Sequence, residues 1–500
     1  MTTNPVFFSP RDDPHRHAMP PRIPQVAHRH GTPSGPWPWA DVVEFEEPNF
    51  LQLLPILGGK PESPVVDISP SAKMWREYPG ILFPNWIESR LLRSGIAAVM
   101  RKKHDEYNPC VVYEIDVEKD GHFSTESEHE KTKLEPQMYD EFWKRMNRSD
   151  TIGKTQEHRL KAIFVENMTG PVLQMLGAMY KIEPFYFSSS LNWIPSRYQE
   201  EAKKGEGDHI TLTLTFLRAL PNPNMTEPST PATRNGYFTQ RAVKAGTVII
   251  DTQAPLPLRS NDKILLIDLI AFHMVRRKGG SIIVSYHPTP EWKTTSARYL
   301  HSKVRFVGES VYWQNIFRQS KDPTFVLLSM LWYALYAWDE ALESLYHHIS
   351  WLESRVLVTN DINLTRDLHV IRASILHYKS LLENFRKSVV FVRVTPNPAM
   401  EDEPEKEDSA KLMEKECDNL LSEIERLEMY RAMQETRLDN IMDLVFNSVT
   451  LEDSRVMKRM AEQSLRDGTA MKQISYLTMV FLPASFVSVG DGDNLLSRTF

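Results

Sequence analysis

The pattern of apolar and polar positions is most regular between residues 408 and 490. Apolar side chains recur there at alternating steps of four and three residues, the spacing that keeps them on one stripe of a helix. The stripe consists of Met413, Cys417, Leu420, Ile424 and Leu427 and resumes at Leu438, Ile441 and Val445. Arg431 and Gln434 interrupt it, which disfavours a tight two-stranded coiled coil. Because no proline lies between Pro404 and Pro483, the pattern predicts one helix about 120 Å long.

The end of this stretch differs from the rest in having no charge. Residues 474–490 are uncharged, whereas residues 408–473 form a charged stalk. Seventeen residues lie at the lower limit for a segment that crosses a bilayer, for which about 20 are usual. Two interpretations stay open on length alone: a short transmembrane segment, or an apolar helix that packs on its own protein. Residues 491–500 are interpreted as a polar tail.

The first three hundred residues mix strand-like and helix-like segments. Residues 1–40 are rich in proline and predict a disordered lead. Short β-branched or aromatic runs predict strands at Cys110–Asp116, Lys161–Val165, Thr211–Leu217, Gly246–Asp251 and Ser281–Tyr286. Helices are predicted at Glu141–Met146, Gly170–Tyr180 and Ile264–Arg277. The fold class is therefore α+β, with an α/β domain containing a mixed sheet over residues 41–310.

Two helices predict a helical hairpin over residues 322–394. Asp322 and Pro323 mark its start, as a cap followed by a proline in the first turn. The aromatic-rich stretch around Trp332 and Trp338 is interpreted as core or interface, with a ligand pocket as the alternative. Residues 395–407 then form an acidic, proline-containing hinge. Its carboxylates are expected to be solvated; a weak divalent-cation sensor is the alternative.

Composition and motifs exclude several classes of protein. The formal net charge of −6 disfavours a nucleic-acid partner. Two cysteines, Cys110 and Cys417, are too few for a disulfide framework or a cysteine-rich zinc site. Glycine-rich nucleotide loops and the common hydrolase motifs are missing from the sequence. We therefore predict no enzyme activity, no cofactor and no metal-ligating residues.

The uncharged segment carries a family resemblance. The run from Ala470 to Val487, with Phe481, Leu482 and Pro483 at its centre, resembles the first transmembrane segment of CorA-like magnesium transporters, in particular a divergent fungal branch. The stalk from Leu438 to Lys458 is similar to the lower stalk of that branch. A weaker similarity covers Glu166–Phe187 in the α/β domain.

The resemblance implies a transport protein. It implies a cytoplasmic N-terminal body, a stalk helix that enters a membrane, and a homopentamer around one pore that conducts Mg²⁺ or a related divalent cation. Gap-free matching implies that the pore is lined by Met471, Ile474, Leu482 and Ser485. We assign no regulatory metal site.

The sequence departs from the family pattern after Ser488. The family's Gly-Met-Asn falls on Gly492, Asp493 and Asn494, and no second apolar span follows. We therefore expect the chain as written to be an incomplete, non-conducting form. The alternative is a cytoplasmic or membrane-tethered helical protein that forms oligomers or binds partners without transport.

Overall fold

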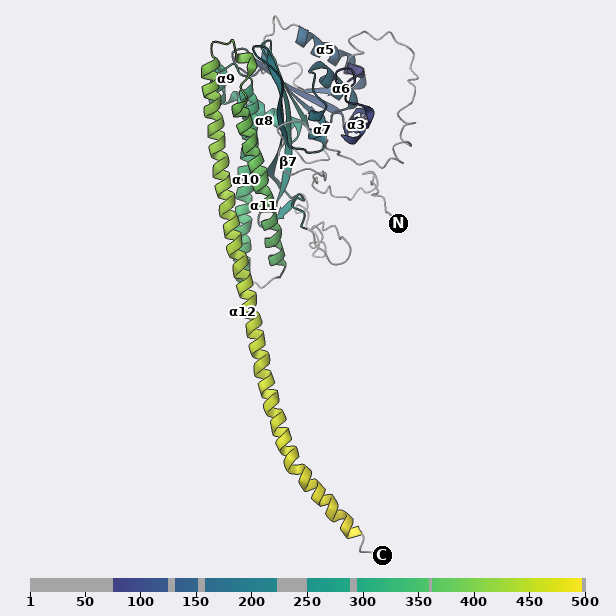
Figure 1. Ribbon diagram of the computed structural model, residues 1–500, viewed down its shortest axis with the longest axis vertical. Helices are drawn as coiled ribbons and strands as arrows, with labels where there is room; N and C mark the ends of the chain where they lie inside the picture. Colours follow the sequence, from purple (N-terminus) through teal and green to yellow (C-terminus); the bar gives the residue numbers. More distant parts are fainter. Residues whose placement is uncertain are drawn as a thin grey trace, which may run out of the picture. The chain divides into compact units, whose positions relative to one another are not determined.

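Segments rich in β-branched and aromatic residues form one mixed eight-stranded sheet in the computed structural model of the protein (Figure 1). The structure describes residues 75–124, 131–151, 158–222, 250–287, 295–358 and 362–496. The strands are β1 (Cys110–Glu118), β2 (Lys131–Leu134), β3 (His158–Glu166), β4 (Ser196–Lys203), β5 (Gly207–Pro221), β6 (Leu256–Leu258), β7 (Lys263–Arg277) and β8 (Ser281–His287). Their order is β2-β1-β3-β8-β7-β5-β4, with β6 beside β7. Strands β3 and β8 are parallel and the other neighbours are antiparallel.

The helices precede, connect and follow these strands. The α-helices are α3 (Glu88–Arg93), α4 (Ile96–Met100), α5 (Tyr139–Thr151), α6 (Gly170–Met179), α7 (Phe185–Leu191), α8 (Ala297–Glu309), α9 (Val311–Gln319), α10 (Thr324–Val358), α11 (Ile362–Val394) and α12 (Lys406–Leu496). Short 3₁₀ turns lie at Pro136–Met138 and Pro398–Met400. The predicted α+β class, with a mixed sheet and a long C-terminal helix, is confirmed.

One predicted helix is wrong. Ile264–Arg277 forms most of the fifteen-residue strand β7, which pairs along its whole length with β5, from Gly207 opposite Arg277 to Pro221 opposite Lys263. Residues 264–276 are all buried, because β7 lies inside the sheet with side chains packed on both faces. Such a strand has a nearly continuous apolar sequence, which periodicity cannot distinguish from a buried helix.

The other predicted strands fall mostly where the pattern placed them. Strands β1, β3, β5 and β8 contain four of the five predicted runs. The fifth, Gly246–Asp251, lies largely outside the described residues. Its last residue belongs to a turn, in which the Asp251 carboxylate accepts a hydrogen bond from the backbone N–H of Gln253 at 3.1 Å.

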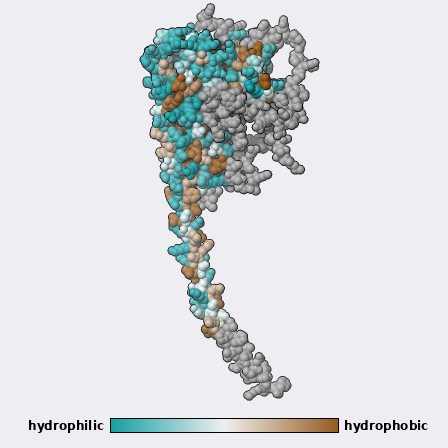
Figure 2. Space-filling model, in the orientation of Figure 1, coloured by the Kyte–Doolittle hydropathy of each residue, from teal (hydrophilic) through white to brown (hydrophobic). Residues whose placement is uncertain are grey.

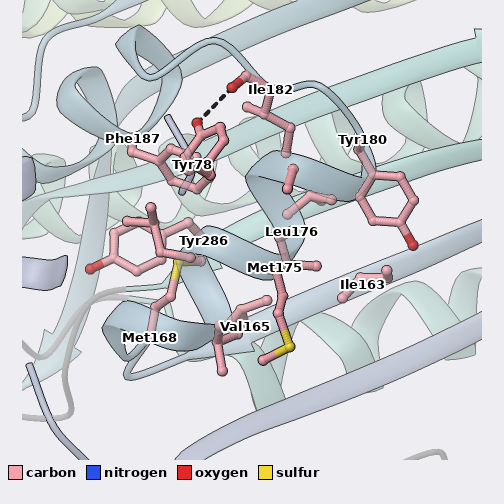
Figure 3. Packing of buried hydrophobic residues seen from close by; sticks show 14 of the residues in the cluster. Tyr78, Ile163, Val165, Met168, Met175, Leu176, Tyr180, Ile182, Phe187 and Tyr286 are labelled. Carbon is pink, nitrogen blue, oxygen red and sulfur yellow. Dashed lines mark hydrogen bonds between the residues drawn. The ribbon is translucent and has the colours of Figure 1, made fainter. Parts of the chain in front are cut away.

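The main core lies between one face of the sheet and helices α3 to α7 (Figure 1). At its centre the Tyr78 ring lies over Gly177 of α6, and its hydroxyl donates to the carbonyl of Ile182 at 2.7 Å (Figure 3). A Cβ atom at position 177 would lie 2.3 Å from the Tyr78 ring, so only glycine allows this contact. Met168, Met175 and Tyr286 fill the space around it.

The opposite face of the sheet is covered by α8 and α10. His301 of α8 contacts Tyr113 and Phe164, and Tyr333 of α10 contacts Phe216. Helix α10 begins where the sequence predicts, because Asp322 accepts hydrogen bonds from the backbone N–H of Thr324 at 3.0 Å and from its hydroxyl at 2.6 Å.

A fully buried ion pair connects the sheet to the ends of both hairpin helices. Arg276 of β7 pairs with Asp208 of β5, and neither side chain is exposed to solvent. The same guanidinium donates to the Thr324 hydroxyl at the start of α10, at 3.1 Å. It also donates to the carbonyls of Thr395 and Pro396, just after α11, at 3.2 Å each. One charged side chain therefore joins the sheet to the start of α10 and to the residues just after α11.

The chain divides into two units, Met1–Ser350 with Val370–Glu435, and Trp351–His369 with Thr436–Phe500. In the first unit the predicted stripe of α12 is buried from Met413 to Leu427. The two polar interruptions are buried as well. Arg431 pairs with Glu428 and Glu435, each at 2.8 Å, and Gln434 donates to the Leu342 carbonyl at 2.9 Å. The stripe of this unit therefore packs within its own chain.

Candidate functional site: the exposed end of helix α12

The part of α12 in the second unit begins at Thr436, and its first turns there contact other residues of the same unit. Leu438, Ile441 and Val445 are buried. Arg437 pairs with Glu353, and Phe446 makes a ring contact with His369 at 6.5 Å between centroids. These contacts hold residues 436–446 against the tip of the α10–α11 hairpin.

Beyond these residues, the described side chains of α12 are not packed against the rest of the protein. Every described side chain from residue 453 to residue 481 is exposed. Many of these side chains are large and apolar. They are Val456, Met457, Met460, Leu465, Met471, Ile474, Tyr476, Leu477, Met479, Val480 and Phe481. Apolar and polar residues alternate along this part of the helix surface (Figure 2). Full burial of one such side chain contributes about 1.5–3 kcal/mol. Contact of this surface with another protein or with lipid would therefore be favourable.

Two of the four predicted pore-lining residues can be described with their side chains. Met471 is 69% exposed and Ile474 is 62% exposed. Leu482, Pro483 and Ser485 belong to the backbone of the same helix, and their side chains lie outside the described part. The helix continues past residue 490, so the start of the expected polar tail is helical as far as Leu496.

The continuous helix places these positions on one stripe. At about 100° per residue, positions 474, 482 and 485 lie within about 60° of position 471 around the helix axis. Their assignment as pore-lining residues stays a prediction.

Asp467 and Thr478 fall on the same stripe and were missed from the sequence. Each lies within about 40° of position 471, one turn before it and two turns after it. The Thr478 hydroxyl donates to the carbonyl of Ile474 at 2.8 Å. Both residues could have been found from the sequence by counting helical turns from the four family-matched positions and listing every residue on the same side of the helix.

The described residues contain no helix that is both long enough and apolar enough to cross a membrane.

Several of the hinge carboxylates form ion pairs while their side chains remain partly or largely exposed to solvent. Glu401 lies 2.8 Å from the Lys204 ammonium and 2.7 Å from that of Lys406. These hydrogen bonds lower the pKa of Glu401 to about 2. Asp402 pairs with Lys278. The sequence could not reveal this because two of the three lysines belong to distant strand ends.

Two further carboxylates of the hinge also lie near a lysine. Glu403 and Glu405 both lie near Lys321, at 3.3 Å and 3.7 Å. The hinge carboxylates that could offer oxygen ligands to a divalent cation are thus paired with lysine ammonium groups. Within the described ranges no cluster of three or more acidic, histidine or cysteine side chains is arranged to hold a metal ion.

The aromatic face of α10 is divided between core and surface. Trp338 is completely buried against Tyr378 of α11, at 6.3 Å between ring centroids. Tyr336 is 66% exposed. Trp338 therefore belongs to the core, and Tyr336 lies on the surface.

Comparison with known proteins locates a family resemblance in the same region. Residues 310–489 match the family model of the CorA-like Mg²⁺ transporter protein. This part of the chain, which contains α10, α11 and most of α12, is CorA-like, and the resemblance inferred from the sequence is confirmed. None of the curated proteins matches the chain.

Solved structures include distant likenesses. The complete CorA magnesium transporter from Methanocaldococcus jannaschii is 11% identical with a TM-score of 0.43, over 70% of this chain and 81% of that one. The ZntB cytoplasmic domain from Vibrio parahaemolyticus is 10% identical with a TM-score of 0.29, over 58% and 92%. The full-length CmaX protein is 11% identical with a TM-score of 0.31, over 77% and 87%.

Proposed function

We propose that this chain is a subunit of a CorA-like assembly that moves Mg²⁺ or a related divalent cation across a membrane. The observation that carries the proposal is the uncovered apolar surface of α12 over residues 453–481, inside the region that the family model matches. The cation is the cargo of such an assembly, so the proposed activity is binding and passage without a catalytic step or a cofactor.

The arrangement that best covers this surface is a bundle of identical copies. Burying side chains such as Met457, Met460 and Ile474 between helices would recover their transfer free energy, about 1.5–3 kcal/mol each when complete. We propose a homopentamer, as the resemblance implies. The uncharged residues 474–490 would enter the bilayer, with the N-terminal body on the cytoplasmic side.

The stripe of α12 would then face the bundle axis. Mg²⁺ releases its bound water reluctantly, so groups that contact a hydrated ion suit its passage better than a tight set of fixed charges. Thr478 and Ser485 would offer hydroxyls, whereas Met471, Ile474 and Leu482 would narrow the path. Asp467 would place one carboxylate per copy before the narrow part and attract cations to it.

The first test concerns the membrane and the assembly. After expression of the full chain, carbonate-washed membranes should retain it, and chemical cross-linking should give a ladder that ends at five copies. Val480→Asp should release the protein from the membrane, because an uncompensated carboxylate in a bilayer is costly. A chain recovered wholly in the soluble fraction would contradict the membrane part of the proposal.

The second test concerns transport. In vesicles that contain a Mg²⁺-sensitive dye and the assembly of a chain with a second transmembrane segment added after Ser488, Asp467→Asn should lower the initial rate of cation entry by several-fold. Glu462→Gln is the matched control, because position 462 lies about 180° from position 471 on the same helix. Equal rates for the two variants would exclude Asp467 from the path. Membrane-bound oligomers of that extended chain without any cation entry would favour the alternative, a non-transport oligomerisation protein.

A further inference from the structure

A surface groove lies between the edge strand β4 and the last turns of α11. It has a volume of about 460 Å³ and is lined by Arg197 from β4 and by six residues of α11. These are Glu383, Arg386, Lys387, Val390, Phe391 and Val394. A volume of this size suits one small organic molecule. All of the lining residues belong to the first unit, so the groove does not include the exposed end of α12.

The charged and the apolar lining residues on α11 occupy different turns of that helix. The charged residues occupy the turn from Glu383 to Lys387, and the apolar ones follow from Val390 to Val394. The middle of the charged turn and the middle of the apolar turn are about 10 Å apart on a helix. Val394 is 67% exposed and Val390 is 38% exposed, so the apolar end is open to water.

The charged end has more cations than its single carboxylate can neutralise. Glu383 lies 3.8 Å from Arg386 and 3.7 Å from Lys387, which are long contacts for ion pairs. Arg197 adds a third cation from the strand. The local balance is therefore three positive charges against one negative charge, and it favours an anion.

Arg197 provides the most specific observation. Its Nη1 atom is removed from solvent and has no hydrogen-bond acceptor among the residues that the structure describes. A buried charged donor without an acceptor is unfavourable, and most such groups in folded proteins have a partner. Burial also lowers the pKa of Arg197 from its ordinary value, opposed by the charge of Glu383. Once the guanidinium turns toward the groove, an anionic oxygen bound there would supply the missing acceptor.

We propose that this groove binds an anionic amphiphile. A phosphate or carboxylate head would lie among Arg197, Arg386 and Lys387, and an apolar chain would lie along Val390, Phe391 and Val394. Inorganic phosphate alone would leave the apolar end uncovered, and three cations are too few for a nucleic acid. The same chemistry occurs in a free amphiphile and in the head group of a bilayer lipid.

The binding test uses dodecyl phosphate below its micelle concentration with the full chain, followed by isothermal titration calorimetry. One molecule should bind per chain. Arg197→Gln and Val394→Asp should each raise the dissociation constant by about tenfold or more, since each removes one half of the recognition. Lys303→Gln, at an exposed lysine of α8 outside the groove, should leave binding unchanged. The exposure of Val394 makes its substitution safe for folding, and circular dichroism of each variant verifies this.

Further probes test whether the groove needs both an anionic head and an apolar chain, and whether the ligand is a free amphiphile or a bilayer lipid. Inorganic phosphate and dodecyltrimethylammonium should bind at least tenfold more weakly than dodecyl phosphate. Co-sedimentation with phosphatidylglycerol vesicles that is lost in Arg197→Gln would support a bilayer lipid as the source, and binding of the monomer alone would support a free amphiphile. Unchanged binding in Arg197→Gln, or equal binding of inorganic phosphate, would overturn the proposal. It would also be overturned if dodecyl phosphate failed to bind while Arg197→Gln altered the number of copies in the oligomer.

Discussion

The buried pair of Arg276 and Asp208 gives the most direct test of how the sheet holds the helices. The substitution Arg276→Met keeps a long apolar side chain and removes all of the guanidinium donors. It leaves the Asp208 carboxylate inside the protein with the Gln199 amide as its remaining side-chain donor, at 2.6 Å. The carbonyls of Thr395 and Pro396 also lose a donor.

The magnitude follows from burial. Both side chains are completely buried, so the abandoned carboxylate cannot regain water without opening the fold. Breaking such a pair from one side costs about 3–5 kcal/mol. In a unit of this size, that corresponds to a decrease of roughly 5 °C or more in the unfolding temperature. The exposed pair of Lys278 and Asp402 gives the contrast, because surface ion pairs contribute about 0–1 kcal/mol.

The assay is a double-mutant cycle followed by near-ultraviolet circular dichroism during heating. Arg276→Met and Asp208→Leu should each lower the unfolding temperature strongly, and the double variant should recover much of the loss, because it leaves no unpaired buried charge. Lys278→Gln is the control and should change the temperature by about 1–2 °C at most. Strictly additive losses, or an Arg276→Met variant as stable as Lys278→Gln, would refute the reasoning.

Three further predictions concern titration, space and reactivity. Burial lowers the pKa of His287 to about 4, so the unfolded chain binds its proton first. Stability should therefore fall as the pH decreases from about 6.5 to about 4, by up to ~3 kcal/mol for this group, and urea titrations should show a weaker pH dependence in His287→Asn. Gly170→Ala should destabilise by about 1–3 kcal/mol in thermal unfolding, since its Cβ would lie 2.0 Å from the Met100 carbonyl oxygen. Gly468→Ala, with nothing within 4 Å, should instead stabilise α12 by about 1 kcal/mol and slow its amide hydrogen exchange. Burial raises the pKa of the Cys110 thiol to about 12, so iodoacetamide at pH 8 should label it only after unfolding in urea, as peptide mass spectrometry would show.

Local sequence patterns predicted those elements whose apolar residues lie on one face of a helix or strand, or whose ends carry a capping residue. The four-and-three spacing from Met413 to Leu427 predicted the buried stripe of α12, and the cap at Asp322 predicted the start of α10. The family-matched run at the end of the chain identified the CorA-like region from its residues alone. The domain boundaries and the pore-lining residues remain predictions.

Patterns failed where long-range packing decides the outcome. The apolar run of β7 is compatible with a buried helix or a buried strand, and its pairing with β5 over fifteen residues made it a strand. The sequence disfavoured a tight two-stranded coiled coil at Arg431 and Gln434, but it did not reveal that both side chains are buried within the chain, Arg431 paired with partly exposed carboxylates and Gln434 bonded to the Leu342 carbonyl.

The sequence by itself determined the elements whose hydrogen bonds and apolar stripes are local, namely the long helices and most strands, together with the CorA-like resemblance of the C-terminal region. Only the tertiary structure decided which charges meet: the lysines on the acidic hinge, Arg276 on Asp208, and Arg197 beside α11. The physical reason is that a helix closes its backbone hydrogen bonds over four residues, whereas an ion pair forms between residues that can be more than a hundred positions apart.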